Sequence, residues 1–417
     1  MDQSVVSGLA PAVYNGSVLE YASEMEADTT MHDRLAYCTN VHPGSNLEMT
    51  REALQTYACA VKAKYAPEHP MGIGLWLSAA TARELVSQPD RLEEFAAWLA
   101  EQGLVPCTFN GFPFGDFHQP VVKHRVYQPA WWEETRAEYT GNLARILDAL
   151  LPPGASGTIS TLPIGWPDRT DPVEHLRSAA QRLEDAVQLL HELSDQRGRR
   201  IILCLEPEPG CILQSSRDVV DFFQTYLWSR RERSWWSRHL GVCHDICHSA
   251  VMFEDQHEAL RTYREADIPI GKVQISSAVR MWLEGIPREH RQAARDELAA
   301  FAEPRYLHQT VWRSEASETR FFEDLPDALA EPDGLEQIEW RIHFHVPIFL
   351  KQIGHVETTQ DEIGRFLGEL GKDEVLHFEV ETYAWSVLPD ELKGIELADG
   401  IAREMAWAAV HLFHKTL

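Results

Sequence analysis

Two histidines, one aspartate and two cysteines lie within ten residues of this chain, in GVCHDICHSA at 241–250. Asp245 ends an apolar run, and His248 follows three residues later. Carboxylate oxygens together with imidazole nitrogens suit Zn²⁺, Mn²⁺ or Fe²⁺, whereas Ca²⁺ prefers oxygen ligands alone. The segment is either a buried strand with several polar atoms or one corner of a metal site, and the rest of the chain must decide between them.

Polar residues also end several other apolar runs. They are His42, Asn110, Glu206 with Glu208, Gln274, His343 with His345, and Glu379 with Glu381. Any one of them alone is typical of a solvated loop residue or of a hydrogen-bonded core histidine. Buried carboxylates that meet at one place repel each other unless a cation is bound. Two glutamates, one aspartate and at least two histidines that converge therefore predict a metal site.

The elements that must position these residues are short apolar runs that alternate with amphipathic stretches. Near-continuous apolar runs are typical of parallel strands that are covered on both faces. The strand candidates are 34–40, 72–78, 104–111, 156–163, 200–208, 240–246, 272–278, 340–348 and 375–383. The helix candidates are 49–65, 81–102, 130–151, 173–197, 215–229, 249–265, 287–302, 359–370 and 391–415.

This alternation predicts a single (β/α)₈ barrel over 34–417, preceded by an N-terminal arm at 1–33. A doubly wound sheet usually has a glycine-rich loop after its first strand, and CTNVHPGSN is not such a loop. The stretch 279–338 departs from the alternation, so we expect an insertion there, after a late strand. Nine candidates then compete for eight strand positions, and the sequence does not show which one is extra. Capping boxes, Thr81 with Glu84 and Thr359 with Glu362, predict two helix starts.

Composition limits the possible partners and the compartment. The 417 residues include 64 acidic and 38 basic side chains, a net charge of −26, which disfavours nucleic-acid partners. The seven cysteines are odd in number and irregularly spaced, so we expect reduced thiols and a cytoplasmic protein. The sequence predicts no secretory leader and no integral membrane segment.

The strand ends also resemble a known group of proteins. Glu, then Asp-x-x-His, then His, then Glu, each ending a strand of one barrel, is similar to the xylose isomerase-like TIM barrels. These include sugar isomerases, ketose epimerases and endonuclease IV. More narrowly, YCTNVHPG, GIGLWLS, FNGFPFGDFH, SGTISTLP and FEVETYAW resemble the EboE family, metabolite traffic protein E, from about residue 34 to the C-terminus.

The resemblance implies roles for individual residues. Glu206, Asp245 and Glu381 match the carboxylate metal ligands, and His248 matches a histidine that binds substrate in epimerases or a further metal in the endonuclease. The fourth ligand of the superfamily is a histidine on the next strand, where this chain has Gln274. We assign that place to His345, with His343 and His308 as alternatives. The EboE family is associated with building and exporting a prenyl-linked cyclitol-type metabolite, so contacts with other proteins of that pathway are also implied.

The function expected from these observations is a metal-dependent isomerase or epimerase for a sugar- or cyclitol-like small molecule. The expected catalytic residues are Glu206, Glu381 and His248. The expected substrate-binding residues are His42, Asn110, Phe112, Gln274, His308, His343 and Trp385. One alternative is a non-catalytic protein that carries a metabolite. The other is an endonuclease IV-like phosphodiesterase, whose local support is the basic and aromatic stretch WSRRERSWWSR at 228–238.

Overall fold

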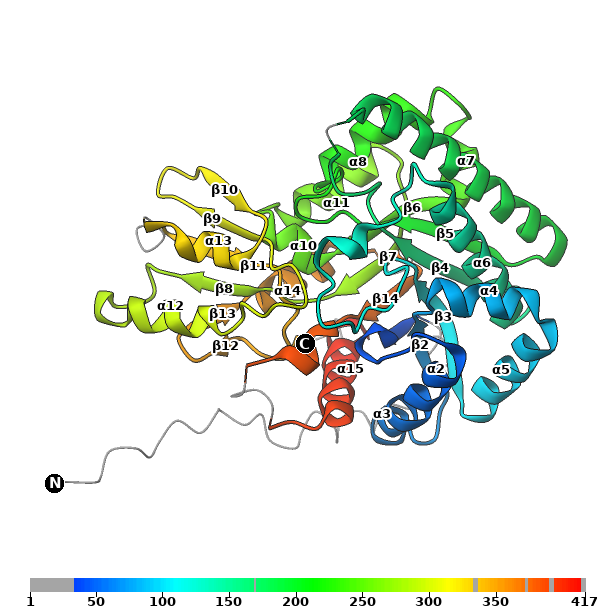
Figure 1. Ribbon diagram of the computed structural model, residues 1–417, viewed down its shortest axis with the longest axis horizontal. Coiled ribbons are helices and arrows are strands. Elements are labelled where there is room, and N and C mark those ends of the chain that lie inside the picture. Colours follow the sequence, from blue (N-terminus) through cyan, green and yellow to red (C-terminus); the bar gives the residue numbers. More distant parts are fainter. Residues whose placement is uncertain (1–33, 169, 333–336, 372–373, 390–393, 414–417) are drawn as a thin grey trace.

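Eight parallel strands close into a barrel at the centre of the molecule (Figure 1). The computed structural model describes residues 34–413 except 169, 333–336, 372–373 and 390–393. In order around the barrel, the strands are β1 (Leu35–Cys38), β14 (His377–Val380), β7 (Ile270–Ile275), β6 (Leu240–Asp245), β5 (Arg200–Leu205), β4 (Ser156–Thr161), β3 (Leu104–Asn110) and β2 (Met71–Leu75). The predicted (β/α)₈ fold is confirmed.

Helices cover the outside of this barrel, as the amphipathic stretches predict. They are α2 (Leu47–Ala53), α3 (Cys59–Tyr65), α4 (Ala79–Ser87), α5 (Pro89–Glu101), α6 (Glu134–Leu150), α7 (Pro172–Arg197), α8 (Ser216–Phe222), α9 (Arg233–His239), α10 (Ile246–Val251), α11 (Gln256–Glu265), α14 (Gln360–Glu369) and α15 (Leu397–Phe413). Because helices cover the barrel outside and side chains fill it inside, every residue of β6 is buried. Apolar continuity therefore identifies barrel strands in this chain.

The single helix expected at 81–102 is two helices. Ser78 caps α4, and its hydroxyl accepts a hydrogen bond from the backbone N–H of Thr81, which lies inside the helix. Pro89 begins α5, where a missing N–H and a fixed φ are tolerated. The capping box expected at Thr81 is therefore replaced by a cap three residues earlier. Thr359 does precede α14, but its side chain makes no capping hydrogen bond.

A second sheet lies beside the barrel, between β7 and β14 in the chain (Figure 1). Its strands, in spatial order, are β10 (Thr319–Phe322), β9 (Thr310–Arg313), β11 (Glu339–Ile342), β8 (Val279–Trp282), β13 (Val356–Thr358) and β12 (Gln352–Ile353). Two helices accompany it, α12 (Arg291–Ala299) and α13 (Leu325–Ala330). The sheet extends from Val279 to Thr358, twenty residues past the expected end of the insertion at 338.

Of the nine strand candidates, the one outside the barrel is 340–348, so the expectation that its histidines end a barrel strand is wrong. Glu339–Ile342 form β11, which pairs antiparallel with β8 and β9. His343 and His345 then lie in the loop that follows β11 and not at the end of a barrel strand. An apolar run of this length fits either sheet, so its pairing partners and not its local pattern decide its place.

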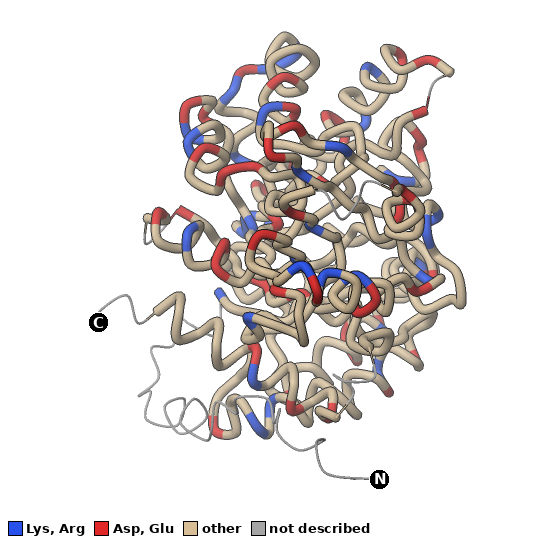
Figure 2. The backbone as a smooth tube through the Cα atoms, turned by 90° about the vertical axis from the view of Figure 1, so that its left-hand side faces the viewer, with Lys and Arg blue, Asp and Glu red and all other residues tan. Residues whose placement is uncertain are grey.

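The basic and aromatic stretch at 228–238 includes most of helix α9. Its arginines have local partners: Arg230 and Arg231 both form ion pairs with Glu184, and Arg233 lies 3.8 Å above the Trp228 ring. Figure 2 shows acidic and basic residues interspersed on the side of the molecule that faces the viewer. None of the described helices is long and apolar enough to cross a membrane.

An ion pair occupies the interior of the barrel. The ammonium of Lys272 on β7 lies 2.7 Å from a carboxylate oxygen of Glu379 on β14, and neither side chain is exposed. Lys272 also donates to the Ser160 hydroxyl at 3.3 Å. Gly74 on β2 makes room for the carboxylate, because a Cβ there would overlap the Glu379 side chain. A buried charge is tolerated only when it is paired, so these two residues depend on each other.

Replacing Lys272 alone should therefore destabilise the barrel strongly. We expect Lys272→Met to lower the free energy of unfolding by about 3–5 kcal/mol, because it leaves the Glu379 carboxylate unpaired. Urea unfolding followed by circular dichroism measures the change. The double variant Lys272→Met/Glu379→Met should recover most of the loss, and a double variant as unstable as the single one would contradict this interpretation.

Candidate metal centre

Three carboxylates meet at the carboxyl end of the barrel. Asp245 is the last residue of β6, Glu206 follows β5, and Glu381 follows β14. Each offers one oxygen, and these three oxygens lie within 4.8 Å of one another. The side chains are almost fully buried: the residues are 2 %, 2 % and 5 % exposed. Parallel strands that end at one edge of a barrel produce this convergence.

Two of the carboxylates have one oxygen held by hydrogen bonds. Asp245 Oδ1 accepts from the His248 backbone N–H at 2.9 Å and from the Ser276 hydroxyl at 2.7 Å. Glu381 Oε1 accepts from the amides of Asn40 at 2.7 Å and Asn110 at 2.8 Å. Asp245 Oδ2 and Glu206 Oε2 are buried and have no hydrogen-bond partner among the described residues. Hydrogen bonds from neighbouring residues thus orient Asp245 and Glu381, while Asp245 Oδ2 and Glu206 Oε2 stay free of hydrogen bonds.

The shared burial changes the acidity of these groups. Burial, and after it the charges of nearby carboxylates, hold the pKa of Glu206 and that of Glu381 well above the usual value. Burial also acts to raise the pKa of Asp245, but the imidazoles of His248 and His345 and two hydrogen bonds outweigh it, so this pKa is lowered. Three such carboxylates cannot all be charged at this distance without a cation nearby.

Two histidines direct their Nε2 atoms at the same place. His345 Nδ1 lies 2.7 Å from the Glu381 carbonyl oxygen, and His248 Nδ1 lies 2.8 Å from that of Pro207. A carbonyl oxygen only accepts, so each Nδ1 carries the hydrogen and each Nε2 keeps its lone pair. Both Nε2 atoms lie 3.8 Å from Asp245 Oδ2. Burial lowers the pKa of His345 to about 4, so its ring is neutral at pH 7.

These atoms fit a divalent cation. Glu206 Oε2, Asp245 Oδ2 and His345 Nε2 are all buried without a hydrogen-bond partner among the described residues. Unsatisfied buried polar atoms are rare in native proteins, and a bound ion is one ordinary reason for them. An imidazole that donates its other N–H to a backbone carbonyl is the usual arrangement of a metal-ligating histidine. Oxygen and nitrogen donors of this kind suit Zn²⁺, Mn²⁺ or Fe²⁺.

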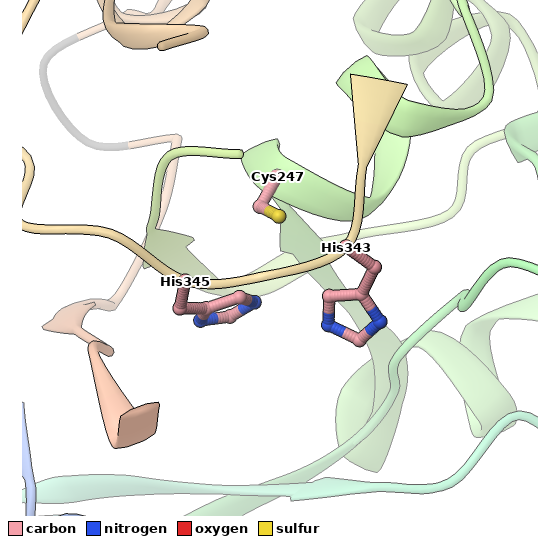
Figure 3. A group of neighbouring side chains, drawn as sticks. All are labelled: Cys247, His343 and His345. Carbon is pink, nitrogen blue, oxygen red and sulfur yellow. The ribbon is translucent and has the colours of Figure 1, made fainter. Parts of the chain in front are cut away.

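Cys247 also lies near the histidines but has a different environment. Figure 3 shows Cys247 beside the loop that carries His343 and His345, and their potential ligand atoms lie within 4.8 Å of one another. The cysteine packs in an apolar cluster with Val251 and Ala278. Burial, together with nearby carboxylates, raises the pKa of its thiol well above the usual value, so the sulfur stays protonated. Its surroundings favour a packing role.

A cavity opens above the carboxylates. Its floor contains the carboxylates of Glu206, Glu208 and Glu381 together with the three histidines at 248, 343 and 345. Its wall is mainly aromatic and apolar, and includes Phe112, Phe117, Tyr127, Tyr306, Leu307 and Tyr383. Polar groups at the bottom and rings around the opening fit a small hydroxylated molecule whose apolar faces pack against the wall.

Of the residues predicted for substrate binding, three line this cavity. Asn110, Phe112 and His343 are part of its lining, as are the predicted catalytic residues Glu206, His248 and Glu381. Asn110 reaches the site through the amide that it donates to Glu381.

The other four predicted substrate-binding residues do not line the cavity. His42 packs against Tyr57 and hydrogen-bonds Tyr37, and Gln274 is fully buried with no partner for its amide among the described residues. His308 hydrogen-bonds Glu303 and the His343 carbonyl, and Trp385 donates to Glu404. His308 thus contacts a lining residue, His343, without lining the cavity itself.

Sequence reasoning did not identify Tyr127 or Gln309. The Tyr127 hydroxyl donates to Glu208 at 2.6 Å, and the Gln309 amide contacts both groups. Tyr127 lies in the long connection after β3, and Gln309 lies in the second sheet just before β9. Neither residue lies at the end of a barrel strand, so the signal that identified Glu206 and Asp245 could not identify them.

Comparison with known proteins adds distant similarities. The sequence matches no protein-family model and no curated protein. Among solved structures, the chain is similar to the IOLI protein with a bound zinc atom (13% identity, TM-score 0.46, 92% of this chain and 99% of that one). It is also similar to the probable 3-DHS dehydratase AsbF from Bacillus anthracis (13%, 0.43, 90% and 98%). A xylose isomerase-like TIM barrel protein from Mycobacterium smegmatis in complex with magnesium is a third (14%, 0.41, 66% and 90%). The closed strand order defines the fold independently of them, and the EboE resemblance stays a prediction.

Metal binding by this site is testable with single substitutions. We expect Asp245→Ala and Glu381→Ala each to abolish tight Mn²⁺ or Zn²⁺ binding, because each removes a charged oxygen donor. Calorimetry on chelator-treated protein measures the affinity, and the midpoint of thermal unfolding shows whether the barrel remains folded.

His244→Ala is the matched control. His244 neighbours Asp245, but its ring points outward, hydrogen-bonds Gln256 at 2.9 Å and stacks on Phe366. This variant should bind the metal as the wild type does. Full metal occupancy in both carboxylate variants would show that the site lies elsewhere.

Proposed function

We propose that this protein is a metal-dependent isomerase or epimerase that acts on a polyhydroxylated, sugar- or cyclitol-like small molecule. The observation that carries the proposal is the set of free donor atoms of Glu206, Asp245 and His345, of which Glu206 and His345 line a cavity rich in aromatic residues. The resemblance of the strand ends to xylose isomerase-like proteins supports the same chemistry. The finer proposal, that the substrate is the cyclitol-type metabolite associated with the EboE family, rests on that resemblance alone.

The cation would be held by Glu206, Asp245, His345 and Glu381. When bound, such an ion polarises a carbonyl and the neighbouring hydroxyl of the substrate. This makes the hydrogen on the adjacent carbon more acidic, so that a protein base can remove it.

Glu206 is the best placed base. Its Oε2 has no hydrogen-bond partner among the described residues, whereas two amides hold Glu381 Oε1. A raised pKa brings a carboxylate closer to the range in which it can accept and return a proton near neutral pH. In the proposed reaction, the Glu206 carboxylate takes the proton from the carbon next to the carbonyl with the oxygen that does not hold the cation. For isomerisation it returns this proton to the neighbouring carbon, and for epimerisation the Glu381 carboxyl group delivers a proton to the opposite face while Glu206 keeps the first one.

The histidines and the wall orient the substrate. The lone pairs of His248 and His343 Nε2 accept hydrogen bonds from substrate hydroxyl groups, and Asn110 keeps Glu381 in place. Phe112 and Tyr383 pack on the carbon skeleton and exclude water from the reacting carbon. Lys123 is the one cationic side chain among the lining residues, and it is paired with Asp324, so the cavity favours uncharged molecules over phosphorylated ones.

Proton exchange tests this function without knowledge of the final product. Protein loaded with Mn²⁺ or Zn²⁺ is incubated in D₂O with ketoses and cyclitol ketones, and NMR detects deuterium on the carbon next to the carbonyl. We expect exchange with at least one compound. Glu206→Gln should lower the exchange rate by about 10²- to 10⁴-fold, because it removes the base.

His244→Ala again serves as the control and should exchange at the wild-type rate. Tight binding of a polyol with no exchange in any metal-loaded sample would contradict the enzyme and indicate a metabolite carrier instead.

A further inference from the structure

Gln309 occupies a central position behind the candidate site. It precedes β9, which pairs antiparallel with β11, so Gln309 lies opposite His343 in the second sheet. The His343 backbone N–H donates to the Gln309 carbonyl at 2.8 Å. The glutamine side chain has no exposed surface. The pairing of these strands therefore places its amide beside the His343 ring.

The surroundings of Gln309 fix the orientation of its amide. Its Nε2 donates to the Tyr127 hydroxyl at 2.7 Å, to Glu208 Oε1 at 3.0 Å and to the Pro209 carbonyl at 3.2 Å. The Pro209 carbonyl can only accept, so the NH₂ group must face that side. The amide oxygen then faces His343 Nδ1 at 2.7 Å. Since an amide oxygen also only accepts, Nδ1 of His343 carries the hydrogen.

This assignment leaves a lone pair on His343 Nε2, which lies 3.1 Å from His248 Nε2. His248 keeps its own lone pair there, because its Nδ1 donates to the Pro207 carbonyl. Two lone pairs at this distance repel each other, and a donor from a ligand would relieve the repulsion. In the other tautomer, His343 Nε2 would carry the hydrogen and donate it to His248 Nε2. Neither nitrogen could then accept a hydrogen bond from a ligand. That tautomer would place a lone pair against the Gln309 oxygen.

We propose that Gln309 is a positioning residue that keeps His343 in the Nδ1–H tautomer, so that His248 and His343 together present two acceptors to hydroxyl groups of the substrate. The substrate role rests on the proposed function, whereas the tautomer does not. The second sheet supplies both Gln309 and His343, and it thereby contributes a hydroxyl-binding pair that the barrel strands lack.

Nitrogen NMR tests the tautomer directly. Chelator-treated protein with ¹⁵N-labelled histidine is studied at pH 8. Long-range ¹H–¹⁵N correlations distinguish Nδ1–H from Nε2–H rings, and the His343→Gln variant identifies the His343 signals. We expect the Nδ1–H pattern in the wild type. An Nε2–H pattern in the wild type would overturn the proposal by itself.

Three glutamine variants sharpen the result. Gln309→Leu removes the acceptor, so His343 should change to the Nε2–H pattern and donate to His248. Gln309→Glu keeps an oxygen opposite Nδ1, so it should retain the wild-type pattern when its second oxygen is protonated and donates to the Pro209 carbonyl as the amide does. Gln256→Leu removes the amide that contacts His244 Nε2 at 2.9 Å, a comparable buried pair outside the site, and should leave the His343 signals unchanged. An unchanged His343 pattern in Gln309→Leu would overturn the proposal.

Kinetic measurements with the substrate found by deuterium exchange test whether His248 and His343 bind substrate hydroxyl groups. Losing these acceptors for hydroxyl groups should raise KM about 2- to 10-fold in Gln309→Leu, with a smaller change in kcat. An unchanged KM together with the expected tautomer change would overturn the hydroxyl-binding role. If no substrate exchanges, the proposed function fails while the NMR result still decides the tautomer. If Gln309→Leu does not fold, the wild-type and Gln309→Glu spectra still decide it.

Discussion

The structure of this site depends on the electrostatic repulsion among three buried carboxylates whose oxygens lie within 4.8 Å of one another. Glu206, Asp245 and Glu381 reach this position because parallel strands end at one edge of the barrel. Hydrogen-bond donors from several segments stabilise these carboxylates against their mutual repulsion. Each donor orients one carboxylate oxygen and leaves the other free. Asn40 and Asn110 do this for Glu381, and Ser276 does it for Asp245. A site built in this way is preorganised for a cation, because much of the cost of bringing the charges together is met when the protein folds.

Charged side chains are also buried deeper in the barrel, below the site. Lys272 lies inside the barrel against Glu379 of β14. Glu379 comes two residues before Glu381 in the sequence. Its positive charge acts to lower the pKa of Glu206 and that of Glu381, against the stronger effect of burial. The interior is therefore not the stack of apolar layers that fills many barrels of this fold. The buried charges inside the barrel are paired with one another. The stability of the barrel therefore depends in part on which charged residues lie at its carboxyl end.

The sequence predicted the barrel and the carboxylates for one reason: both are local properties of a strand. Apolar continuity identified the eight strands, and the polar residue at the end of a run identified Glu206 and Asp245. The same signal placed 340–348 in the barrel, because a run that pairs in a second sheet has the same local pattern. It could not identify Tyr127, which lines the cavity from a long connection, or Gln309, which contacts the lining residue Glu208 from the second sheet. Those contacts depend on how distant segments pack, and no spacing in the sequence encodes them.

The loop after β11 brings a histidine to the carboxylates, whereas β7 brings none. The resemblance implies a histidine ligand on that strand, and this chain has Gln274, which is fully buried and outside the cavity lining. His345 instead approaches Asp245 from the loop after β11, held by the Glu381 carbonyl. Backbone carbonyls fix the rings of both His345 and His248, whereas a side chain, Gln309, fixes His343. A backbone acceptor cannot be removed by substitution, but a side-chain acceptor can. Of the three imidazoles, His343 is thus the one whose hydrogen-bonding character a single mutation can change without moving the barrel.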